Sequence, residues 1–143
     1  MPFEALGIDV IGSISPSSTK GHQFILTITD YFSKWEEAIP LKTSNVVNFI
    51  KHHVIHLFGV PRRIIHDKGP QFASQVFYRF CNRYRIQNVT STAYNPAANG
   101  LAEAFNKIII KLLKKFVSSN KRDWNEKLSE YLCLPNHNSD PNR

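Results

Sequence analysis

The chain has 143 residues, a length typical of one domain, and its 42% hydrophobic and 20% charged residues exclude a largely disordered protein. Lysine and arginine outnumber aspartate and glutamate by 18 to 11, so the formal charge of +7 suits a polyanionic partner without requiring one. Two cysteines exclude a disulfide framework, and no apolar run approaches the roughly 20 residues that cross a bilayer, so we expect a soluble, intracellular protein with no membrane partner.

The first three predicted elements are strands. Residues 3–14 are rich in apolar residues and contain one acid, Asp9, before a Ser-Pro turn. Residues 23–29 and 35–41 are rich in β-branched and aromatic residues, and a short turn-like segment separates them. Three consecutive strands with short connections predict an antiparallel meander.

Helices then alternate with short strands. Apolar residues at helical spacing predict a helix over 44–58, with Ser44 at its start and Gly59 at its end. A buried strand over 63–66 leads into Asp67, and a fifth strand is predicted over 87–92. Between these two strands, a second helix is indicated by its apolar residues: Val76, Phe77, Phe80, Cys81 and Tyr84.

The clearest element is a helix over about 99–118, whose apolar residues form one stripe: Leu101, Phe105, Ile108, Ile109, Leu112, Leu113 and Phe116. At about 100° per residue, Glu103, Lys107 and Lys114 project from the opposite side. A short helix begins after Asp123, and residues 133–143 are predicted to be an irregular tail. The order of elements predicts an α/β fold, a five-stranded mixed sheet flanked by helices in a ribonuclease H-like arrangement, with one domain over residues 3–132.

Basic residues gather in segment 107–122, which contains no acid: Lys107, Lys111, Lys114, Lys115, Lys121 and Arg122. Such a cluster suits contacts with phosphates. A charge run alone is nevertheless more often a solvated helix face, and both interpretations remain open on this evidence.

Three acids are candidates for a metal-dependent site. Asp9 lies in an apolar strand where an ionised carboxylate needs a partner, Asp67 follows a buried strand, and Glu103 lies in the first turns of the long helix. Each has an ordinary alternative: an ion pair or a sheet edge for Asp9, a turn for Asp67, and the helix dipole for Glu103. Acids from two strands and one helix can converge at one sheet edge, where carboxylates hold two Mg²⁺ ions for phosphoryl transfer.

Four segments resemble the integrase core of long-terminal-repeat retrotransposons of the Ty3/gypsy kind, which are relatives of retroviral integrases: GIDVIG, KGHQFILTITDYFSKWEEAIPLK, FGVPRRIIHDKGPQF and TSTAYNPAANGLAEAFNK. Between Asp67 and Glu103 stand 35 residues, the spacing of that family's D,D-35-E signature, and Asp9 stands in its first-acid context. The resemblance covers about residues 3–132 and implies a ribonuclease H-like fold.

The resemblance also implies an integrase-type polynucleotidyl transferase in which Asp9, Asp67 and Glu103 hold two Mg²⁺ or Mn²⁺ ions. The implied reactions are hydrolytic trimming of the element's DNA ends and direct attack of the new 3′-hydroxyl on target DNA, without a covalent enzyme intermediate. The implied partners are element ends and target DNA, with a homo-oligomer in the intact family. Residence in the nucleus follows from that substrate.

DNA contacts are implied by the same resemblance. The family's E-x-x-N-K pattern, which begins at Glu103, places Asn106 and Lys107 beside DNA, with Lys107 as a phosphate contact. Ala97 stands where the family commonly has glutamine, and we expect this to weaken one loop contact to DNA without affecting the metals. The loops and the basic helix supply the remaining predicted contacts: Gln71, Tyr94, Asn95, Asn99, Lys111 and Lys114.

Two other functions remain as hypotheses. The family's upstream zinc module and downstream basic domain are missing, and a Pro- and Asn-rich tail follows residue 132, so we expect a truncated or frameshifted copy. The main alternative is therefore a non-catalytic nucleic-acid-binding remnant. A ribonuclease H-like nuclease acting on RNA–DNA hybrids shares the acids, but the loop and helix around Glu103 disfavour it.

The remaining candidate residues are expected to be structural. His52, His53 and His56 lack a third ligand and an adjacent glutamate, so we predict packing or solvent-facing roles rather than a zinc site. Three further side chains are predicted to pack in the core: Trp35, Cys81 and Trp124.

Overall fold

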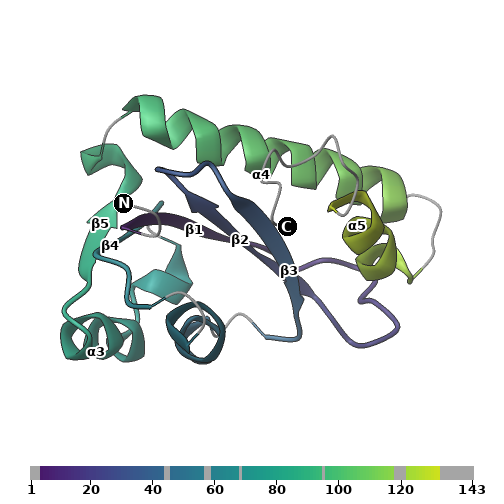
Figure 1. Ribbon diagram of the computed structural model, residues 1–143. Helices are drawn as coiled ribbons and strands as arrows, with labels where there is room; N and C mark the ends of the chain where they lie inside the picture. Colours follow the sequence, from purple (N-terminus) through teal and green to yellow (C-terminus); the bar gives the residue numbers. More distant parts are fainter. Residues whose placement is uncertain are drawn as a thin grey trace.

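The computed structural model describes residues 4–43, 46–56, 59–67, 69–94, 96–117 and 122–132. At its centre is a mixed sheet of five strands in the order β3-β2-β1-β4-β5 (Figure 1). β1, β2 and β3 pair antiparallel as predicted, whereas β4 is parallel to β1 and β5 is parallel to β4. The strands are β1 (Ala5–Gly12), β2 (Phe24–Asp30), β3 (Glu36–Leu41), β4 (Arg63–His66) and β5 (Gln87–Thr90).

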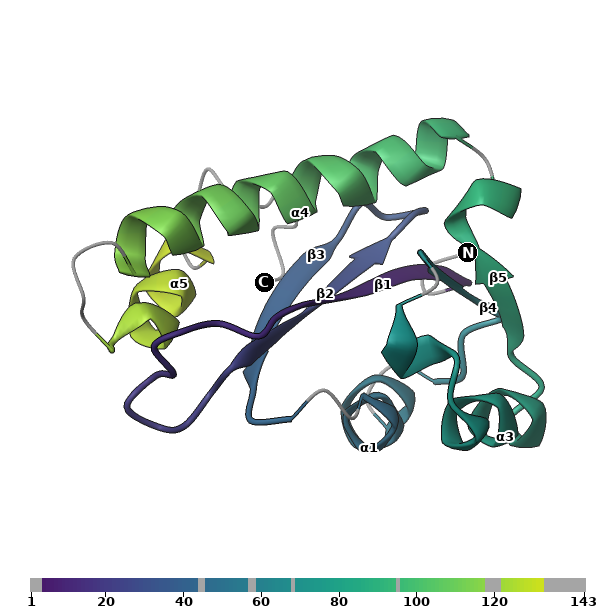
Figure 2. The same cartoon turned by 180° about the vertical axis from the view of Figure 1, so that it is seen from behind.

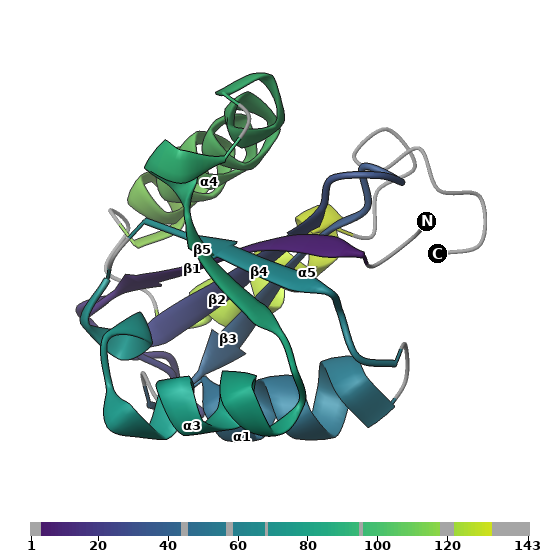
Figure 3. The ribbon, with the colours of Figure 1, turned by 90° about the vertical axis from the view of Figure 1, so that its left-hand side faces the viewer.

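Helices cover both faces of the sheet, which explains why the central strands are apolar on both sides (Figure 3). Side chains alternate along each strand, so β2 presents Ile25 and Thr27 to the face covered by the two C-terminal helices. The antiparallel register places Asp9 directly opposite Thr27, and both side chains therefore face those helices. The other face carries a separate apolar cluster that includes Leu6, Ile8, Leu26 and Ile28.

The helix predicted over 44–58 is present in a different form. It comprises α1 (Val47–Phe49) and a π-helical segment of 6 residues, η1 (Ile50–Ile55). The π form was not predicted because apolar spacing over so short a segment does not separate it from an α-helix. Gly59 has a φ of +88° and its amide donates to the Ile55 carbonyl at 3.0 Å, so the predicted helix end is confirmed. Ser44, Leu57 and Phe58 lie outside the described residues.

The second predicted helix is α3 (Gln75–Arg83), which follows a short 3-10 helix, η2 (Pro70–Phe72). The Ser74 hydroxyl caps α3 by accepting a hydrogen bond from the Phe77 amide at 3.2 Å. Val76, one of the apolar residues that indicated this helix, is 56% exposed and does not share the buried side that Phe77 occupies. The buried residues of α3 are Phe77, Phe80 and Cys81.

The long helix is α4 (Pro96–Val117), which starts three residues earlier than the predicted start at residue 99 and crosses the second face of the sheet (Figure 1). Ile108 is 42% exposed, so its assignment to the buried stripe was wrong, because at 100° per residue it lies at the edge of that stripe. Within the described segments, no helix combines the length and the apolar content of a membrane span. The stripe and the final helix, α5 (Trp124–Leu132), share one buried cluster that includes Phe105, Ile109, Leu113, Trp124 and Leu128.

The connection between β1 and β2 runs beside α5, as Figure 2 shows from behind. Trp124 is fully buried, and its indole nitrogen donates to the Pro16 carbonyl at 3.0 Å, so its predicted packing role is confirmed. Arg122 was counted in the basic segment, but its guanidinium donates to the Ser17 carbonyl at 2.9 Å. Arg122 therefore stabilises the β1–β2 connection and does not extend the basic side of α4.

Candidate active site

A pocket of about 100 Å³ lies between the sheet and the N-terminal half of α4. Its walls come from β1, β2, the end of β4 and α4. Asp9, Asp67 and Glu103 all line it. The structure therefore brings together side chains that are far apart in the sequence.

Asp9 occupies the centre of β1 and is half-buried beneath α4. The Val10 amide donates to its Oδ1 at 2.8 Å, and the Asn106 side-chain amide donates to its Oδ2 at 2.9 Å. Burial, reinforced by the adjacent Asp67 carboxylate, raises the pKa of Asp9 to about 6. The ionised form of Asp9 is therefore only partly compensated by its hydrogen bonds.

Asp67 follows directly after β4, whose predicted bounds of 63–66 are confirmed. The parallel register pairs Gly7 with Ile65, so two residues further along both strands Asp9 and Asp67 reach neighbouring positions. Asp67 is exposed and lies at the open side of the pocket. Lys68, the next residue in the sequence, lies outside the described residues.

Glu103 is exposed on α4 and lines the pocket from the helix side. Because α4 begins at Pro96, Glu103 lies beyond the first turn, and the first turn contains no acid. A favourable interaction with the helix dipole, which is concentrated in that turn, does not explain this glutamate. Within the described segments, no three His, Cys, Asp or Glu side chains are close enough to enclose one ion. Asp9 and Asp67 are therefore a pair of neighbouring acids, and Glu103 lines the same pocket without forming a closed group of three ligands with them.

Tyr31 lines the pocket and was not singled out in the sequence, where it belongs to an ordinary turn. Its ring stacks on Tyr94 with a centroid separation of 5.6 Å, and its hydroxyl donates to the Asn99 Oδ1 at 3.5 Å. Burial raises the pKa of Tyr31 to about 12, with smaller contributions from Tyr94 and Glu103. A Cβ atom at Gly7 would lie 2.7 Å from the Tyr31 hydroxyl, so only glycine leaves room for this ring.

The predicted DNA contacts fall into three groups. Tyr94 and Asn99 lie near the pocket, and Asn99 also donates to the Ser91 carbonyl. Gln71 lines a separate groove with Val46 and Ser74, so it is not part of the acid-lined pocket. Asn95 lies outside the described residues.

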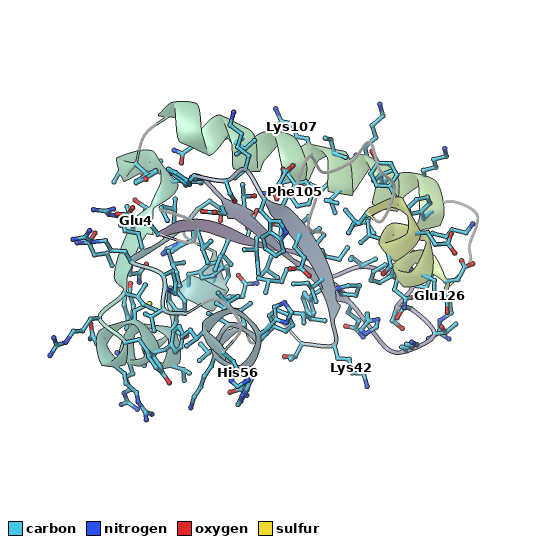
Figure 4. The ribbon with its side chains drawn as sticks, viewed as in Figure 1. Glu4, Lys42, His56, Phe105, Lys107 and Glu126 are labelled. Atoms are coloured by element: carbon cyan, nitrogen blue, oxygen red, sulfur yellow. The ribbon has the colours of Figure 1, made fainter. Side chains whose placement is uncertain are left out.

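The third group lies on α4. Asn106 is half-buried and turned toward Asp9, whereas Lys107 is exposed and points away from the sheet (Figure 4). Phe105, between Glu103 and Lys107, points toward the sheet in the same view. Lys111 and Lys114 are exposed like Lys107, and Lys121 lies outside the described residues.

The histidines of the first helical region have the packing or solvent-facing roles that were predicted. His53 stacks on Phe49 at a centroid separation of 4.7 Å, and its Nε2 lies 3.7 Å from the Glu37 carboxylate. His52 and His56 are exposed. Cys81 is buried in α3 as expected, and burial raises the pKa of its thiol to about 11.

The family can be assigned by comparison with known proteins. The sequence model of the integrase core domain family matches residues 1–96 of the chain. This segment contains Asp9 and Asp67 and ends before Glu103. The chain belongs to the integrase core domain family. The resemblance to retrotransposon and retroviral integrases that the sequence motifs indicate is thereby confirmed.

The curated relatives of this integrase core domain are viral and transposon polyproteins. The Gag-Pol polyprotein of avian reticuloendotheliosis virus is 32% identical over 122 residues, which cover 80% of this chain and 11% of the polyprotein. The Tf2-3 transposon polyprotein of Schizosaccharomyces pombe is 30% identical over 132 residues, which cover 90% of this chain and 10% of the polyprotein. The chain thus spans about a tenth of the length of these relatives.

Solved retroviral integrases share the fold. An intasome of simian T-cell lymphotropic virus is 30% identical with a TM-score of 0.61, covering 84% of this chain and 43% of the viral one. The HTLV-2 integrase catalytic core domain, solved in complex with magnesium, is 29% identical with a TM-score of 0.58, covering 83% of this chain and 74% of the viral one. The predicted ribonuclease H-like arrangement is therefore confirmed.

Proposed function

We propose that this integrase core domain is the catalytic core of a DNA integrase and that the acid-lined pocket carries out both 3′-end processing and DNA strand transfer. The observation that supports this most strongly is the pairing of Asp9 with Asp67, with Glu103 on the opposite wall of the same pocket. Two neighbouring carboxylates repel each other unless a proton or a cation lies between them. Burial and, to a smaller extent, that repulsion raise the pKa of Asp9 to about 6.

The donor set fits divalent magnesium or manganese. Carboxylate oxygens are the ligands that these ions prefer, and the similar HTLV-2 core was solved with magnesium. In our proposal Asp9, Asp67 and Glu103 would hold two such ions. Such ions, when bound, activate an attacking oxygen and stabilise the leaving oxygen of a phosphodiester.

The protein's own contribution is to fix the carboxylates and to hold the DNA. The Val10 amide and the Asn106 side chain each occupy one lone pair of an Asp9 oxygen, and the other lone pairs remain available. In end processing, a water oxygen bonds to phosphorus and the bond to the departing 3′-oxygen breaks. In strand transfer, a DNA 3′-hydroxyl takes the place of the water, so one pocket serves both reactions.

DNA binding is proposed to follow the outer side of α4 and the loop before it. Lys107, Lys111 and Lys114 are exposed along that side and suit phosphate groups, while Tyr94 and Asn99 lie at the pocket where a DNA end would enter. Phosphate contacts of this kind weaken steeply as salt concentration rises. The intasome and the dimeric and trimeric HTLV-2 cores among similar structures support a further proposal of homo-oligomeric assembly. Residence in the nucleus is proposed with it, because chromosomal DNA would be the substrate.

The proposal is tested by incubating the purified chain with a branched DNA that mimics a strand-transfer product. Reversal of the joining step is scored in Mn²⁺ and in EDTA, for the native chain and for Glu103→Gln. This reaction requires the pocket but little assembly. We expect reversal in Mn²⁺ only. Glu103→Gln should lower the rate of reversal more than about 100-fold, because removing a metal ligand should have a larger effect than removing a residue that only orients a ligand.

One outcome would replace the proposal by its main alternative. If the folded chain binds DNA in a salt-sensitive manner but reverses no joining in Mn²⁺, it is a non-catalytic nucleic-acid-binding remnant. The open position of Glu103, which forms no closed cluster with Asp9 and Asp67 among the described residues, is the feature that favours this alternative.

A further inference from the structure

A polar side-chain relay crosses the layer between the sheet and α4. The Thr27 hydroxyl donates to the Asn106 Oδ1 at 2.7 Å, and the Asn106 Nδ2 donates to the Asp9 Oδ2 at 2.9 Å. Thr27 is only 2% exposed and lies directly opposite Asp9 in the antiparallel register of β1 and β2. Its hydroxyl therefore reaches Asp9 through a residue of α4.

The relay has a defined direction. An asparagine side chain has one accepting oxygen and one donating nitrogen, and rotating it by 180° exchanges them. In the rotated form the amide oxygen would face the Asp9 carboxylate, which repels it when ionised. The Thr27 hydroxyl can donate only one hydrogen bond. When the Asn106 oxygen accepts it, the Asn106 nitrogen is left to donate to Asp9. The contact from Thr27 to the Asp9 carbonyl is longer, at 3.4 Å, and competes weakly for the proton.

We propose that Thr27 is a positioning residue for the cation site: by locking the amide of Asn106, it fixes the Asp9 carboxylate in the orientation that receives a divalent cation. This inference rests on the proposed function and adds a residue that does not touch the ion. The Val10 amide holds Oδ1 of Asp9 and the relay holds Oδ2, so neither oxygen is free to rotate. Partners that orient a ligand in this way typically change metal affinity by about 10–100-fold.

A purely structural role for Thr27 predicts something different. If the hydroxyl only satisfies a buried strand position, its removal lowers folding stability and leaves the affinity for a cation unchanged. The two roles are separated by comparing Thr27→Val, which keeps the shape but removes the donor, with Thr27→Ser, which keeps the donor. Thr29→Val is the matched control, because Thr29 is equally buried on the same face of β2 but lies opposite Gly7 instead of Asp9.

Affinity for Mn²⁺ is measured on the full chain without DNA, from the signal of free Mn²⁺ in an electron paramagnetic resonance titration. We expect Thr27→Val to bind Mn²⁺ about 10–100-fold more weakly, and Thr27→Ser and Thr29→Val to stay within about threefold of the native chain. In an Asn106→Ala background, Thr27→Val should have no further effect, because the relay is already broken. Should Thr27→Val fail to fold, Thr27→Ala removes the same donor without adding a methyl group.

The possible failures are distinguishable. Equal Mn²⁺ affinity in the native chain and Thr27→Val overturns the positioning role of Thr27 and leaves the proposed function intact. An additive loss when Thr27→Val is introduced into Asn106→Ala also overturns it. If the native chain binds no Mn²⁺, or if Asp9→Asn binds it equally well, the proposed function and this inference fail together.

Discussion

Two aspartates in neighbouring strands illustrate opposite ways of burying a carboxylate. Asp30, at the end of β2, is fully buried, and its Oδ2 accepts from the Ser33 hydroxyl at 2.6 Å and from the Ser33 amide at 3.3 Å. Its Oδ1 accepts from the Phe32 amide at 3.4 Å. Asp9, in the middle of β1, is less buried, yet it faces the Asp67 carboxylate.

The difference lies in the neighbours rather than in the depth of burial. The turn after β2 surrounds Asp30 with donors, so this carboxylate stabilises the turn that joins β2 to β3. Asp9 has two donors and one like charge beside it, so burial, reinforced by the Asp67 carboxylate, raises its pKa to about 6. Asp30 therefore contributes to the fold, and Asp9 carries a cost that only a cation or a proton relieves. A cost of this kind is typical of functional sites.

The largest stability effect is expected at Asp30. Asp30→Ala should lower the free energy of unfolding by about 2 kcal/mol, because the three hydrogen bonds that this buried carboxylate accepts are lost. Asp30→Asn, which retains one accepting oxygen, should lose about half as much. Urea denaturation followed by circular dichroism measures both values, and a loss below about 0.5 kcal/mol for Asp30→Ala would refute the structural role of this carboxylate.

A smaller effect of opposite sign is expected at Asp9. In EDTA at pH 8, Asp9→Asn should raise the free energy of unfolding by roughly 1 kcal/mol, because it removes a partly buried charge and its solvent-screened repulsion from Asp67. The folded chain holds the Asp9 proton more tightly than the unfolded chain, so the native protein loses this stability as pH rises from about 4 to about 6.

The pH dependence gives the control for that prediction. Near pH 3, which is below both the ordinary aspartate pKa of 3.8 and the folded value of about 6, Asp9 is largely protonated in both states, and the native chain and Asp9→Asn should be equally stable apart from changed hydrogen bonds. Asp30→Asn, in contrast, should destabilise the chain at pH 8, where Asp9→Asn stabilises it. A uniform destabilisation by Asp9→Asn across this pH range would mean that the two aspartates do not differ in the way proposed.

Much of the fold was predictable because local patterns carry it. Strand β4 has a buried apolar centre between Pro61 and Asp67, and the buried side of α4 follows from the spacing of Phe105, Ile109 and Leu113. The candidate acids were found because Asp9 interrupts an apolar strand and because the motifs around Asp67 and Glu103 resemble a known family.

The polar contacts within the pocket were not predictable in the same way. Thr27 and Asn106 are 79 residues apart, and Thr27 fits a strand by β-propensity alone, so nothing local indicates its hydrogen bond. Asn106 was expected to lie beside DNA, but its contact with Asp9 spans 97 residues and depends on how α4 crosses the sheet. Tyr31 likewise gains its role only when the turn after β2 approaches Tyr94.

The central claim is that Asp9 and Asp67 belong to one cation site. Thermal unfolding of the native chain and of Asp9→Asn, in EDTA and in Mn²⁺, tests this claim most directly. At a Mn²⁺ concentration of about ten times the dissociation constant, the native chain should gain about 1.4 kcal/mol, or roughly 4 °C in Tm, while Asp9→Asn gains little. The variant should therefore melt above the native chain in EDTA and lose that advantage in Mn²⁺. Equal stabilisation of both proteins by Mn²⁺, or of neither, would contradict the account.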